Sequence, residues 1–83
     1  MELAARATLE AIAAAEGMQG LLALEGVQSI PAFGREFAFV AVTARQQRRL
    51  SLLTGTCEVQ ESLETAGALA VLDATNRWLA IER

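Results

Sequence analysis

The chain has 83 residues and a mass of 8.8 kDa, which is enough for one domain and no more. Hydrophobic residues make up 53% of the chain, so it can bury enough apolar surface to fold compactly. The net charge of −3 makes strong nonspecific binding to nucleic acid unfavourable. Because there is no His and a single Cys, a Ser-His-Asp triad and an internal disulfide are both excluded.

The first predicted element is a helix over residues 2–15, where strong helix formers continue without a break until Gly17. Glu2, Arg6 and Glu10 lie at i,i+4 spacing and support this helix. The same charges exclude the uncharged apolar core of a secretory signal, and no apolar run is long enough to span a bilayer. We therefore expect a cytoplasmic protein that does not bind membranes.

Three strands are predicted in the middle of the chain. Residues 21–30 form the first, with a kink or bulge at Gly26, and residues 36–44 form the second, which is rich in aromatic and β-branched side chains. Residues 49–59 form the third. The connections at residues 31–34 and 46–47 are short, which favours an antiparallel meander.

A second long helix is predicted from about Glu61 to the end of the chain, with Ser62 or Gln60 near its start. The expected fold is therefore α+β: one domain over residues 1–83, in two layers and in the order α-β-β-β-α. Two helices would cover one face of a three-stranded antiparallel sheet. This order resembles that of double-stranded-RNA-binding-like domains, which implies nucleic-acid binding as one possible function.

Both faces of the second strand are apolar. Phe37, Phe39 and Ala41 point to one side, and Ala38, Val40, Val42 and Ala44 point to the other. A domain of this size cannot cover two apolar sheet faces, and leaving about 500 Å² of apolar surface in water would forfeit about 12 kcal/mol. Either the two helices lie on opposite faces, or a second chain covers one face.

We expect the second arrangement, with self-association as a homodimer or docking on another protein chain. In the second helix, Leu69, Leu72 and Leu79 lie opposite the arc that would pack on the sheet, and Asn76 lies among them. A buried Asn can fix the register of such a contact. The predicted interface residues are Val40, Val42, Leu69, Leu72, Asn76 and Leu79.

Few residues are candidates for binding an ion or for catalysis. Arg45, Arg48 and Arg49 cluster at the second reversal, where they form either a solvated hairpin tip or a contact for an anion or nucleic acid. Asp73 and Arg77 are spaced as a local ion pair, and Cys57 is expected to be a buried small hydrophobe. We expect no catalytic residue, no metal site and no cofactor.

The segment AGALAVLDATNRWL, residues 66–79, is similar to the closing helix of the isopropylmalate synthase regulatory region. The resemblance implies a small regulatory or accessory domain. The favoured function is thus a non-catalytic, self-associating interaction or regulatory module. The alternatives are nucleic-acid binding and the sensing of a small ligand near Phe33 and Phe37.

Overall fold

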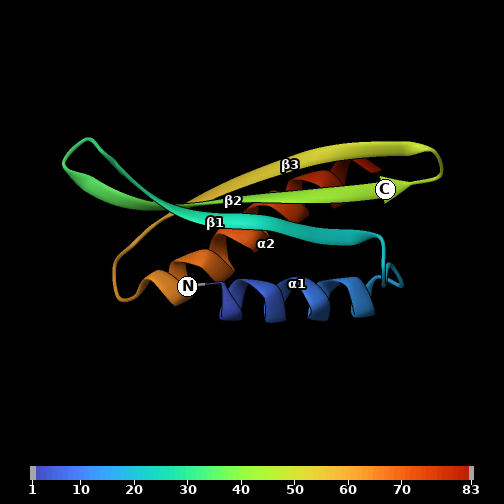
Figure 1. The fold of residues 1–83 in the computed structure, drawn as a ribbon, viewed down its shortest axis with the longest axis horizontal. Coiled ribbons are helices and arrows are strands. Elements are labelled where there is room, and N and C mark those ends of the chain that lie inside the picture. Colours follow the sequence, from blue (N-terminus) through green and yellow to red (C-terminus); the bar gives the residue numbers. More distant parts are fainter. Residues whose placement is uncertain (1, 83) are drawn as a thin grey trace.

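The computed structural model describes residues 2–82. The elements are α1 (Leu3–Ala15), β1 (Leu22–Ala32), β2 (Arg35–Gln46), β3 (Arg49–Glu58) and α2 (Leu63–Glu82). The strands form an antiparallel sheet in the order β1-β2-β3, and both helices lie on the same side of it (Figure 1). The predicted α-β-β-β-α fold is confirmed, and the alternative with one helix on each face is not adopted.

The irregularity predicted near Gly26 is a β-bulge. Leu24 pairs with Val42 and Gly26 pairs with Ala41, so Glu25 is an extra residue on β1. The turn between β1 and β2 places Phe33 and Gly34 at φ values of 56° and 71°. Glycine adopts this left-handed conformation freely, whereas a phenylalanine there is strained.

The two helices begin side by side. Ser62 caps α2, because its Oγ accepts a hydrogen bond of 3.1 Å from the N–H of Thr65. The N–H of Ala4, in the first turn of α1, donates to Oε2 of Glu64 at 3.0 Å. An N–H group at the start of α1 is thus satisfied by a side chain from the start of α2.

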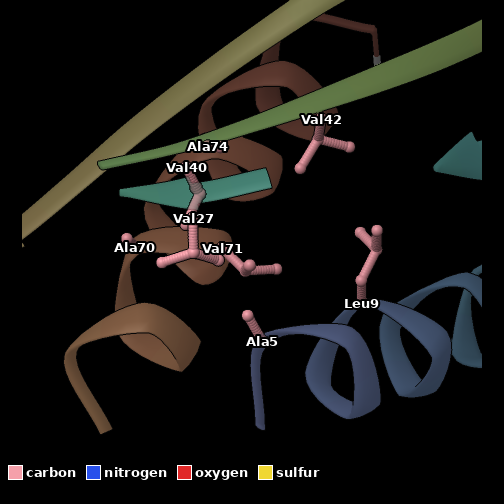
Figure 2. Packing of buried hydrophobic residues seen from close by; sticks show 8 residues of the cluster. All are labelled: Ala5, Leu9, Val27, Val40, Val42, Ala70, Val71 and Ala74. Carbon is pink, nitrogen blue, oxygen red and sulfur yellow. The ribbon is translucent and has the colours of Figure 1, made fainter. Parts of the chain in front are cut away.

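The core lies between the sheet and the helices. Its residues come from every helix and from β1 and β2, and they point toward one another in Figure 2: Ala5, Leu9, Val27, Val40, Val42, Ala70, Val71 and Ala74. Most of these side chains are small, so the helices lie close to the sheet. Trp78 is buried on the same side of α2.

Gly55 of β3 allows α2 to approach the sheet closely. A Cβ atom at this position would lie 2.2 Å from the carbonyl oxygen of Ala70 and 2.7 Å from the backbone nitrogen of Ala74. Only glycine fits under the helix there. Cys57, two residues further along β3, is partly buried and packs against the core, which agrees with its predicted structural role.

Candidate functional site

No helix covers the second face of the sheet (Figure 1). We call it the open face, and it carries the side chains that alternate with the core side chains along each strand. The large apolar side chains of the open face are Ile30 of β1, Phe37 and Phe39 of β2, and Leu50 and Leu52 of β3. Leu50 and Leu52 are 68% and 65% exposed, so a substantial apolar surface is in contact with water.

Val40 and Val42, which were predicted at an interface, lie instead in the core. Both are 0% exposed, because they point toward α1 and α2. The two faces of β2 differ in size: small side chains face the helices, and Phe37 and Phe39 lie on the open face. The helices can pack closely only against small side chains, so the bulky face of the strand is the one left uncovered.

The predicted interface residues of α2 lie on a separate surface, on the outside of the helical layer. Leu69 is 47% exposed and Asn76 is exposed, whereas Leu72 and Leu79 are half-buried. These four residues remain available to a partner, but they include a single large apolar side chain with high exposure. The open face carries more such side chains, among them Leu50 and Leu52.

The edge of β3 is occupied by side chains of α2. Arg77 donates from Nη2 to the carbonyl oxygen of Thr54 at 2.8 Å, and the N–H of Thr56 donates to Oδ2 of Asp73 at 3.2 Å. Asp73 and Arg77 also form the predicted ion pair, with 3.2 Å between Oδ2 and Nη2. The pair therefore uses backbone groups of β3 that an incoming strand would need.

The edge of β1 is irregular. The bulge at Glu25 interrupts the ladder near its middle, and Pro31 near its end has no N–H to donate. Bulges, prolines and charges are the features by which natural sheets discourage pairing with another chain. Neither edge is thus suited to strand addition.

A hollow of about 250 Å³ lies at the middle of the open face. It is lined by Glu25, Gly26, Gln28, Phe39 and Ala41. The hollow exists because Gly26 and Ala41 are register partners and neither has a bulky side chain.

The two ends of the sheet differ in charge. At one end, Arg45, Arg48 and Arg49 line a common hollow at the connection between β2 and β3, and we call this group the basic turn. At the opposite end of the same strands, Glu58 accepts from Arg35, with 3.1 Å between Oε2 and Nη1. Glu36 also lies at that end, where it is hydrogen-bonded to Ser29.

The described residues include no group of three His, Cys, Asp or Glu side chains that could hold a metal ion. Within residues 2–82, neither helix combines the length and the hydropathy needed to cross a membrane. Phe33, near which a ligand pocket was predicted, lies at the tip of the turn between β1 and β2 and is 92% exposed, whereas Phe37 lies on the open face.

No protein-family model matches the chain, and no curated protein or solved structure is significantly similar to it.

Proposed function

We propose that this protein is a non-catalytic interaction module that forms a homodimer through the open face. The observation that carries the proposal is the apolar surface of a sheet that is covered on one side only. The chain exposes 5361 Å² to solvent, compared with about 4,800 Å² expected for a monomer of its mass. The difference of about 560 Å² is comparable to one uncovered sheet face.

The area of the open face is sufficient for a dimer. Three strands about 4.8 Å apart, each with about ten residues at about 3.3 Å per residue, cover about 480 Å² in projection. Two such faces bury about 1,000 Å² between them, before the relief of the side chains is counted. This value reaches the lower bound for a specific interface between proteins.

A second copy of the chain is the occupant that best fits the shape of the open face. A sheet face is well covered by another sheet at about 10 Å, because the side chains of both faces interdigitate. A twofold dimer also covers both open faces at once, so that no apolar face is left for further copies.

Two matched substitutions test the proposal. Leu52→Glu places a charge on the open face, and Leu69→Glu places the same charge on the outer side of α2; both wild-type side chains are exposed, at 65% and 47%. In light scattering at micromolar concentration, the wild type and Leu69→Glu should have about twice the mass of 8.8 kDa, and Leu52→Glu should be monomeric.

A monomeric wild type at these concentrations would overturn the proposal. Dissociation by Leu69→Glu with no effect of Leu52→Glu would instead place the interface on α2, among Leu69, Leu72, Asn76 and Leu79. Circular dichroism of each variant serves as the control for folding.

Nucleic-acid binding through the basic turn has less support. Its three arginines are close together, as an anion site requires. However, the start of α2 carries Glu61 and Glu64, so the helix end that such a domain would present to phosphates is acidic.

A further inference from the structure

We infer that two copies of the chain pack open face to open face in an antiparallel orientation, with the basic turn of each copy over the Glu58 end of its partner. The inference rests on the proposed dimer and adds its geometry. The twofold axis would cross the strands near Ala41, so that the ends of the sheet exchange places between the two copies.

The distribution of charge supports this orientation. Arg45 lies near the end of β2 and shares the open face with Leu50, its register partner. Glu58 and Phe37 form the corresponding pair at the other end of the open face. A parallel dimer would place Arg45 against Arg45 of the partner subunit, whereas the antiparallel dimer places it near Glu58 of the partner subunit.

The charges outside the open face follow the same pattern. Arg48 and Arg49 add positive charge at the basic turn. Glu36 and Glu61 add negative charge at the opposite end, which is net negative although Arg35, the partner of Glu58 within the chain, also lies there. The molecule is elongated, with principal extents of 41, 20 and 19 Å, so these two groups of charges are well separated (Figure 1). An antiparallel pair of such molecules brings unlike charges together at both ends.

The apolar side chains are also complementary in this orientation. Ile30, Phe37 and Phe39 lie toward the Glu58 end, and Leu50 and Leu52 lie toward the basic turn. The ends exchange, so Phe37 and Phe39 on β2 of one copy lie at the same end as Leu50 and Leu52 on the neighbouring strand β3 of the other copy. The small pair Gly26 and Ala41 lies at the crossing point, where the two sheets approach most closely.

Two charge reversals test the orientation. In homodimers of Arg45→Glu or of Glu58→Arg, like charges would meet at both ends, and the dissociation constant should rise about tenfold. In a mixture of the two variants, both contacts become attractive. The heterodimer should therefore form in excess over either homodimer in native mass spectrometry, with an affinity close to that of the wild type. In a parallel dimer, each homodimer would instead bind as the wild type does, and the heterodimer would bind more tightly than the wild type.

Glu10→Arg is the matched control, because Glu10 is an exposed residue of α1 on the other side of the molecule and the change of charge is the same. It should dimerise like the wild type and should not prefer Arg45→Glu as a partner. The loss of the pair between Arg35 and Glu58 does not enter the dissociation constants, because the pair lies within one chain and is absent from the free Glu58→Arg chain as well as from its dimers.

The change of the dissociation constant with salt concentration provides an independent test of the orientation. Raising sodium chloride from about 50 to about 300 mM should weaken an antiparallel dimer several-fold, because salt screens the attraction between unlike charges. A parallel dimer would become tighter, because the repulsion between its basic turns would be screened.

Three outcomes would overturn the orientation. The heterodimer of the two variants could bind more tightly than the wild type, salt could tighten the dimer, or neither charge reversal could change its affinity. In each case, a monomeric Leu52→Glu would still support the open face as the interface, so the two proposals fail separately.

Discussion

Substitution of Gly55 by Ala should be the most damaging small change in the sheet. The added Cβ atom would lie 2.2 Å from the carbonyl oxygen of Ala70, whereas an ordinary contact begins at 3.4 Å. The backbone of α2 would have to move away from β3 by about 1.2 Å to restore normal packing. A backbone atom cannot rotate aside as a side chain can, so the whole helix must shift.

The expected loss of unfolding free energy follows from this displacement of the α2 backbone. Overpacking a core by one methyl group costs about 1–3 kcal/mol, and the need to move a helix backbone places Gly55→Ala near the upper end. For a domain of this size, about 1 kcal/mol corresponds to about 4–8 °C in melting temperature. A loss of about 3 kcal/mol should therefore lower the melting temperature by at least about 12 °C.

Urea and thermal unfolding, followed by the fluorescence of the buried Trp78, provide the measurement. Gly26→Ala is the control, because Gly26 is also a strand glycine but nothing in the same chain lies within 4 Å of the added Cβ atom. Both substitutions are made in Leu52→Glu, because Gly26 lies at the proposed crossing point of the dimer. All variants are compared at one protein concentration, so that any self-association affects them equally. If Gly55→Ala were as stable as Gly26→Ala, the close approach of α2 to β3 would be refuted.

Three further experiments have defined expected outcomes. Phe33→Asn should stabilise the protein by about 0.5–1 kcal/mol in urea unfolding, because Asn tolerates the left-handed conformation better than Phe; a loss of stability would count against turn strain. Thr75 is fully buried and its Oγ1 donates to the carbonyl oxygen of Val71 at 2.8 Å. Thr75→Val, which keeps the volume, should be more stable by about 1 kcal/mol than Thr75→Ser, which leaves a cavity, and the reverse order would contradict this ranking. In a titration with duplex RNA at two salt concentrations, binding should be weaker than about 10⁻⁵ M at physiological salt; tight binding that is lost on charge reversal at the basic turn would favour the alternative function.

Much of the fold followed from local patterns in the sequence. The run of helix formers before Gly17, the β-branched and aromatic residues of the second strand, and the short connections predicted α-β-β-β-α with strand limits close to those observed. The bulge at Gly26 was also predictable, because a glycine inside a strand pattern often marks one. Each of these signals acts within a few residues of the chain.

The identity of the covered face did not follow from the same signals. Both faces of β2 are apolar, so alternation alone could not tell Val40 from Phe39. One signal in the chain bears on this choice: Gly55 is the register partner of Val40, and a glycine in a strand marks a place where another backbone comes close. This glycine would have assigned Val40 to the helix side and the phenylalanines to the outside.

The amino-acid sequence by itself thus determined the elements, their order and the surplus of apolar side chains, because periodicity and composition are local properties. The tertiary structure decided which of these side chains are covered, and it brought Asp73 and Arg77 to the edge of β3, 17 and 23 residues away in sequence from the groups they bind. These arrangements depend on how closely two backbones can approach, and that distance is set jointly by residues that lie far apart in the chain.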